Sequence, residues 1–161
     1  MLGLSYIIFL HKSTNEHGVH SPFVYDLLTK GIYSKNKTTN NSNIILKNKK
    51  ANALWHKIAD YFQFKNNNAN SLDYIFIQPK ETLETQLQLG DNNCCFIFKN
   101  PYKNREQLNK WNQLVQNPQL HVTIDLYYLG LAFKRPQQQK EHFVLAPSKT
   151  ISAFLFEKLK V

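Results

Sequence analysis

Two short apolar runs in the second half of the chain decide the fold: SLDYIFI at residues 71–77 and CCFIF at residues 94–98. Each run is continuous rather than alternating, which is the form of a strand buried on both faces of a sheet. Gln78-Pro79 ends the first run, and the turn residues Gly90-Asp91-Asn92 precede the second. Between the runs, KETLETQLQL at residues 80–89 has the spacing of a short helix.

Helical and extended patterns continue on both sides of this unit. Apolar residues at helical spacing predict helices over residues 51–64 and 105–116. Residues 121–135 are typical of a hairpin with its turn at Leu129-Gly130, and residues 141–146 of a further extended segment. Strands that alternate with helices predict an α/β protein.

Length and composition favour one compact domain. The chain has 161 residues, of which 42% are hydrophobic, enough for one core but not for two full domains. The run MLGLSYIIFL at residues 1–10 stops at His11-Lys12, is too short to cross a bilayer and has no small-residue cleavage site after it. We therefore expect a cytoplasmic protein without membrane contact. Cys94 and Cys95 are neighbours in an apolar run and lack metal-site spacing, so we interpret them as reduced core residues.

The net charge of +9 raises the hypothesis of nucleic-acid binding. Only Arg105 and Arg135 among the twenty basic residues offer the bidentate guanidinium fork, which disfavours specific recognition. Five of the lysines lie in the Asn-rich stretch at residues 34–50, and we interpret residues 36–50 as a basic, solvated linker. A basic isoelectric point predicts non-specific association rather than a fold.

The motif HGVHSPF at residues 17–23 combines two histidines with a helix start. Ser21 is a good N-cap, Pro22 suits the first helical position, and Gly31 can end a helix over residues 22–30. Since no cysteine or set of acids nearby completes a ligand set around His17 and His20, the motif favours structural packing over metal binding.

Two segments produce a resemblance to a known family. NEHGVHSPFVYDLLTK at residues 15–30 and VTIDLYYLGLAFKRPQQQKEHFVL at residues 122–145 resemble the two ends of a family of class I S-adenosylmethionine-dependent methyltransferases found in Bacteroidetes. The resemblance implies a partial Rossmann-like sheet with flanking helices and a C-terminal antiparallel hairpin. Residues 73–77 and 94–98 then correspond to the fourth and fifth strands of that sheet, and residues 1–10 to a helix that packs away from them.

The middle of the chain departs from that family. Methyltransferases of this class use a glycine-rich turn after the first strand and an acid after the second to hold the cofactor. The five glycines here are far apart, and FKNNNANS at residues 64–71 stands where the first three strands belong. Acids follow the fourth and fifth strands in the family, whereas this chain has Gln78-Pro79-Lys80-Glu81 and Lys99-Asn100-Pro101, whose lysines are interpreted as solvated loop residues.

These observations predict a degenerate methyltransferase-like protein without catalytic activity and without a bound cofactor. No catalytic, cofactor-binding or metal residue is carried over from the family. The predicted division is an N-terminal helical segment at residues 1–35, the linker at 36–50 and a truncated methyltransferase-like α/β domain at 51–161. One alternative is an active methyltransferase subunit completed by a partner chain, and another is a basic anion- or nucleic-acid-binding module. Without the first strand, residues 73–77 form a sheet edge, which predicts self-association or a partner chain there.

Overall fold

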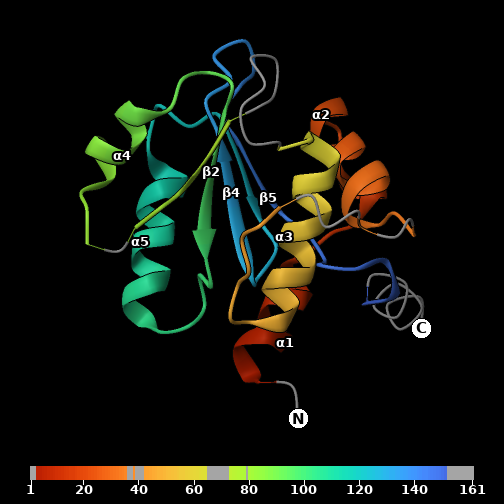
Figure 1. The fold of residues 1–161 in the computed structure, drawn as a ribbon. Coiled ribbons are helices and arrows are strands. Elements are labelled where there is room, and N and C mark those ends of the chain that lie inside the picture. The colour runs from red at the N-terminus through yellow and green to blue at the C-terminus, as the bar shows by residue number, and fades with distance from the viewer. Residues whose placement is uncertain (1–2, 36–37, 39–41, 65–72, 79, 152–161) are drawn as a thin grey trace.

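The protein is a three-layer α/β structure with a five-stranded mixed sheet between two layers of helices (Figure 1). The computed structural model describes residues 3–35, 38, 42–64, 73–78 and 80–151. The helices and strands are α1 (Leu4–Lys12), the 3-10 turn η1 (Glu16–Gly18), α2 (Pro22–Asp26), the π-helix η2 (Leu27–Ile32), α3 (Lys49–Phe62), β1 (Asp73–Phe76), α4 (Leu83–Leu89), β2 (Cys94–Lys99), α5 (Arg105–Gln116), β3 (Val122–Asp125), β4 (Leu129–Phe133) and β5 (Glu141–Val144). The predicted α/β class and the helices and strands from residue 51 onward are confirmed.

The strands lie in the order β1-β2-β4-β3-β5. β1 is parallel to β2 and β3 is parallel to β5, whereas β4 is antiparallel to both of its neighbours, β2 and β3. Four strands therefore point the same way, and their carboxyl ends meet at one edge of the sheet. We call this edge the carboxyl edge; α3 and α5 begin there and α1 lies beside it (Figure 1).

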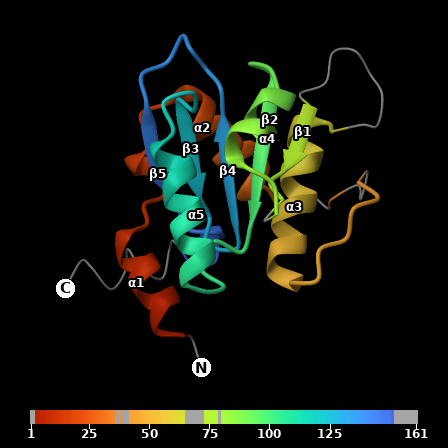
Figure 2. The same ribbon diagram turned by 90° about the vertical axis from the view of Figure 1, so that its left-hand side faces the viewer.

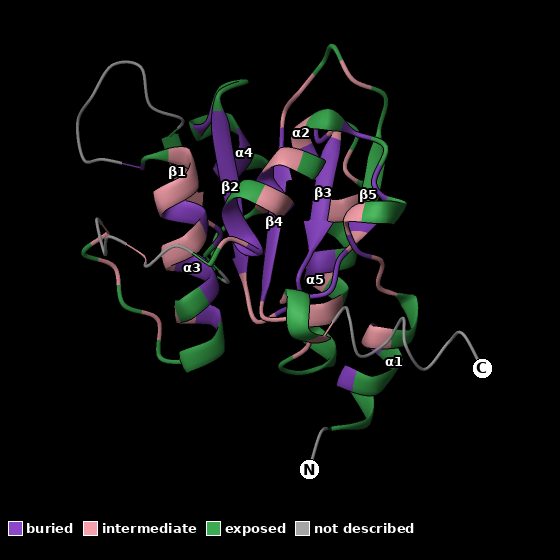
Figure 3. Ribbon diagram, turned by 90° about the vertical axis from the view of Figure 1, so that its right-hand side faces the viewer, coloured by how far each residue is buried: buried purple, intermediate pink, exposed green. Residues whose placement is uncertain are grey.

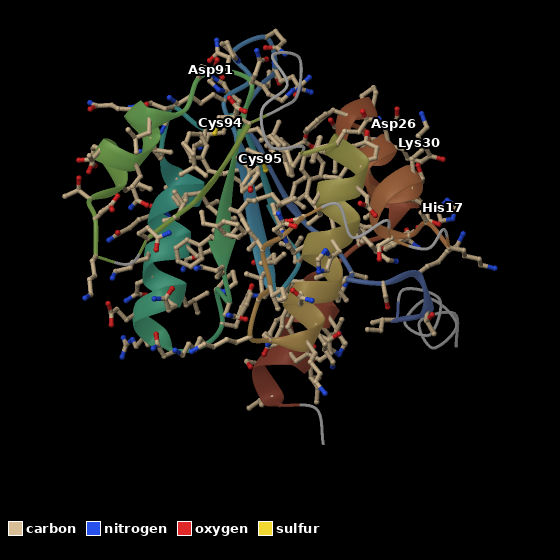
Figure 4. The ribbon with its side chains drawn as sticks, viewed as in Figure 1. His17, Asp26, Lys30, Asp91, Cys94 and Cys95 are labelled. Atoms are coloured by element: carbon tan, nitrogen blue, oxygen red, sulfur yellow. The ribbon has the colours of Figure 1, made fainter. Side chains whose placement is uncertain are left out.

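Each face of the sheet buries its own hydrophobic cluster, because successive side chains of a strand point to opposite faces. Cys95 and Ile97 pack with α3 and η2, while Cys94, Phe96 and Phe98 pack toward α4 and α5 (Figure 4). The central strands β2, β3 and β4 are buried almost throughout (Figure 3). Both cysteines are free and buried, and burial raises the pKa of Cys94 to about 12, so the interpretation as reduced core residues is confirmed.

The helix after HGVHSPF begins as predicted but does not end as predicted. The Ser21 hydroxyl accepts a hydrogen bond from the Val24 N–H, and Pro22 takes the first helical position. Gly31 does not end the helix, which continues in π form to Ile32. Gly31 is buried there, and an added Cβ would lie 3.1 Å from the Tyr61 side chain, so this glycine permits close packing of η2 on α3.

The C-terminal hairpin is confirmed, but its turn lies elsewhere. The chain reverses at Leu126–Tyr128, where Tyr127 has a left-handed backbone with φ 66°, and Leu129 and Gly130 are the first residues of β4. Gly130 is required by close packing instead of by turn geometry, because a Cβ there would lie 2.4 Å from the Trp111 ring. Sequence patterns cannot distinguish these two uses of glycine.

The described end of the predicted linker packs on the core. Ile44 and Leu46 pack against the hydrophobic cluster under α3, and Asn48 caps α3, which begins at Lys49. The N-terminal residues Leu27 and Leu28 belong to this same cluster. The described residues of the N-terminal segment, of the linker and of the α/β domain therefore share one core.

The two outer strands differ in how their edges are covered. Thr14 forms a bridge with Leu145, and its N–H donates to the Val144 carbonyl, which covers part of the edge at β5. Among the described residues no strand pairs with the outer edge of β1. α1 is helical, as the resemblance implies, and lies on the far side of the molecule from β1 (Figure 2). No helix in the described ranges is long and apolar enough to span a bilayer.

Replacing Gly130 with alanine is expected to destabilise the fold by about 1–3 kcal/mol, the usual cost of overpacking a core. The Trp111 ring cannot move aside freely, since its N–H is bonded to a buried carboxylate. Urea unfolding of Gly130→Ala measures the loss. In a Trp111→Phe background the smaller ring leaves room, so the same alanine should cost less; an equal cost in both backgrounds would contradict the steric explanation.

The outer edge of β1 predicts concentration-dependent self-association, because unpaired N–H and C=O groups invite a second chain. Ile77 is only 7% exposed, so a lysine there would bury a charge, but Ile75 is half-buried and a lysine can reach solvent. Light scattering after size exclusion should show that Ile75→Lys reduces association. Leu89→Lys, at an exposed position of α4, is the matched control and should leave association unchanged. A wild-type chain that stays monomeric at high concentration rules the prediction out.

Candidate functional site

The carboxyl edge carries the candidate functional site, because ligands of doubly wound sheets bind beyond the carboxyl ends of the strands. A cavity of about 390 Å³ lies there between residues 45–48, the ends of β1 and β2, and the turn that leads into α5. Ile77 and Phe98 form part of its apolar wall. We call it the carboxyl-edge cavity.

Three lysines line the carboxyl-edge cavity, and no Asp or Glu of the described ranges does. Lys47 comes from the segment before α3, Lys99 from the end of β2 and Lys103 from the turn before α5. Within the described residues none of the three forms an ion pair. The Lys99 ammonium lies 5.3 Å from the centre of the Phe76 ring, a contact that holds it at the end of β1. The cavity is therefore positively charged.

Local hydrogen bonds fix the segment that carries Lys47. The Leu46 N–H donates to Asn52 Oδ1 at 2.7 Å, and Asn48 Oδ1 accepts from the first backbone N–H groups of α3. Lys47 is thus held between two anchored residues, although the polar composition of this stretch suggested a solvated linker.

The turn that carries Lys99 and Lys103 is fixed by a buried carboxylate. Asp125, at the end of β3, is only 2% exposed. Its Oδ2 accepts from the Tyr102 hydroxyl at 2.7 Å and from the Trp111 indole N–H at 3.1 Å, and its Oδ1 accepts from the Tyr127 N–H at 2.9 Å. Burial raises the pKa of Asp125, and these three hydrogen bonds oppose the rise. Tyr102 lies between Lys99 and Lys103 in sequence, so the carboxylate anchors the whole turn.

An aromatic cluster covers the rest of the carboxyl edge. Tyr102 stacks on Tyr127 with ring centres 4.7 Å apart, and Tyr6 and Phe9 of α1 also pack against Tyr127. Burial raises the pKa of Tyr6 and of Tyr102. This packing explains why α1 lies here and excludes water from the surroundings of Asp125.

A second cavity, of about 510 Å³, lies between α4 and α5 and has a mixed lining. Glu81, Glu84 and Lys110 bring both signs of charge to it. Gln86 is buried there, and its side chain bonds to the backbone of the loop after β1, including the Gln78 N–H and carbonyl. Gln86 thus holds the loop in place.

The motif HGVHSPF forms no metal centre in the described part of the chain. His17 and His20 are both exposed, and no group of three potential ligands forms among the described residues. Figure 4 shows His17 far from Cys94 and Cys95. The interpretation of the motif as a packing element needs one correction: its buried residues are Val19 and Ser21, and neither histidine packs in the core.

Comparison with family models, with curated proteins and with solved structures found no match to this chain.

Sequence reasoning missed both parts of the site. Asp125 and Tyr102 carry no local signal, because their contact spans 23 residues. Lys47 and Lys99 were each interpreted as solvated, and only the fold brings them to one cavity.

Replacing Tyr102 with phenylalanine is expected to cost about 2 kcal/mol at pH 7, the range for a hydrogen bond to a charged group. The folded-state pKa of Asp125 lies above its unfolded value, so the folded chain loses stability as pH rises through that raised pKa. The Tyr102 hydroxyl favours the ionised form, so its loss should cost less at pH 4 than at pH 7.

Urea unfolding at the two pH values measures this difference. Tyr25→Phe is the control, since Tyr25 is 45% exposed and lies far along the chain from Asp125. An equal cost of Tyr102→Phe at both pH values would show that the hydroxyl does not act through the carboxylate.

Proposed function

We propose that this chain is a non-catalytic relative of the class I S-adenosylmethionine-dependent methyltransferases that keeps the second half of their sheet. The strand order carries the proposal. The resemblance implies a fourth strand beside a fifth and a fifth beside an antiparallel last strand; β1, β2 and β4 have this order and these directions. β3 completes the hairpin, and β5 extends the sheet beyond it.

The length of the connection before β1 supports the absence of a cofactor half. Ten residues separate the end of α3 at Phe62 from the start of β1 at Asp73. A single parallel crossover needs about a dozen residues or more. Three further strands with their helices, and the glycine-rich turn that they carry, do not fit there.

The chemistry of the carboxyl edge supports the loss of catalysis. The cofactor is a sulfonium cation, and a site for it favours nearby negative charge. The carboxyl-edge cavity instead presents Lys47, Lys99 and Lys103, and Asp125, the acid that ends β3, is buried and bonded to three donors. A bound cation would be repelled by the three lysines.

We expect no binding of S-adenosylmethionine or of its demethylated product by calorimetry at ligand concentrations up to about 1 mM, where affinity would amount to about 4 kcal/mol. The thermal unfolding midpoint should likewise not rise in the presence of either ligand, since only a ligand that binds the folded state raises it. Cooperative unfolding of the same sample establishes that the protein tested is folded.

A micromolar dissociation constant for either ligand would overturn the proposal. Binding that develops only after addition of a second chain bearing a glycine-rich turn would favour the alternative, an active subunit completed at the outer edge of β1.

A further inference from the structure

We propose that the carboxyl-edge cavity binds a small organic phosphate, with the phosphate held by Lys47, Lys99 and Lys103 and the organic part against Ile77 and Phe98. This inference does not depend on methyltransferase ancestry. It rests on a cavity to which three separate segments each contribute a lysine, and whose described lining residues include no Asp or Glu.

Electrostatics selects an anion of high charge. The three lysines that line this cavity carry like charges, which repel, and the described residues offer them no ion-pair partner. A phosphate monoester carries close to two negative charges at neutral pH and three acceptor oxygens. Its binding therefore removes a repulsion that the free protein retains.

The N-terminus of α5 adds to the positive potential in the cavity. Lys103 and Gln107 both line the cavity, so the first turn of the 12-residue helix α5 borders it. The N-terminus of a helix carries a partial positive charge that favours anions. Glu106, in that turn, pairs with Lys110 at 2.7 Å and does not line the cavity.

The scaffold around the three lysines is fixed, which reduces the cost of binding. Lys99 ends a buried central strand, and Lys103 follows the turn anchored by Tyr102 on Asp125. The N–H of Asn100 donates to the Tyr128 carbonyl, which ties the same turn to the hairpin. The lysine side chains thus extend from a backbone that does not need to be reordered.

Size and lining favour a small molecule over a nucleic acid. A volume of about 390 Å³ lies in the range of small-molecule sites, about 300–1,000 Å³. Ile77 is 7% exposed and Phe98 4% exposed, so the apolar wall is deep rather than spread over an open surface. A nucleic-acid duplex would contact the rim of the cavity but not this apolar wall.

Phenyl phosphate is a suitable probe because it joins one phosphate to one ring. We expect it to bind with a dissociation constant below about 1 mM, measured by calorimetry and by amide chemical-shift changes at residues 45–48 and 99–107. Inorganic phosphate should bind to the same amides more weakly, since it lacks the ring, and phenol should not bind. Added NaCl should weaken binding of both anions.

Lysine substitutions test the location. Lys99→Met should weaken phenyl phosphate binding by about tenfold or more, the effect of losing a hydrogen bond to a charged group, and Lys103→Met should also weaken it. Lys12→Met is the matched control: Lys12 is exposed at the end of α1, and its loss changes the net charge by the same amount. Thermal unfolding checks that all three variants fold.

Three results would overturn the proposal. The first is no binding of phenyl phosphate at 10 mM, and the second is equal weakening by Lys12→Met and Lys99→Met, which would show a general charge effect. The third is tighter binding of a 12-base-pair duplex than of phenyl phosphate, sensitive to Lys99→Met, which would assign the lysines to nucleic acid.

Discussion

The carboxylate of Asp125 joins the parts of the structure that meet at the carboxyl edge. It accepts hydrogen bonds from the turn after β2, from α5 and from the hairpin turn, and so fixes three connections with one side chain. Removing a carboxylate from water is costly unless its oxygens are bonded, and here three donors meet that need. This requirement also constrains the three donors. If one of them moved away, the buried carboxylate would lose a hydrogen bond and its contacts with the other two donors would become less stable. The position of Trp111 in turn excludes any side chain at residue 130, which is why the second residue of β4 is a glycine.

Much of the fold could be predicted from local patterns. Residues 94–98 were predicted as a strand from a short continuous apolar run, and residues 105–116 as a helix from apolar residues at helical spacing, and the structure confirms both. The errors fall where tertiary packing overrides a local signal. Gly31 suggested a helix end and Gly130 a turn, but Gly31 is a site of tight packing against Tyr61, and at Gly130 the Trp111 ring comes too close for a Cβ.

Much less of the candidate site could be predicted from the sequence. The lysines at positions 47, 99 and 103 are separated by up to 56 residues, and each has an ordinary explanation as a solvated residue. Their convergence depends on two facts that no local pattern contains: residues 44–46 pack on the core, and the turn after β2 is anchored by a hydrogen bond over 23 residues. A basic composition indicated an affinity for anions but could not place it.

The outer strands β1 and β5 connect the proposed ancestry with the proposed ligand. At β5 the bridge from Thr14 satisfies part of the outer backbone, so this half of the sheet is closed within the chain. At β1 a sheet of the full family would continue into the strands that carry the cofactor, and the described residues provide no strand there. A chain that lost those strands would keep the carboxyl-edge cavity beyond β1 and β2. It would no longer need acids there to hold a cofactor. In such a chain, lysines around the carboxyl-edge cavity would impair no catalytic activity. They would give the sheet a binding site for ligands of negative charge.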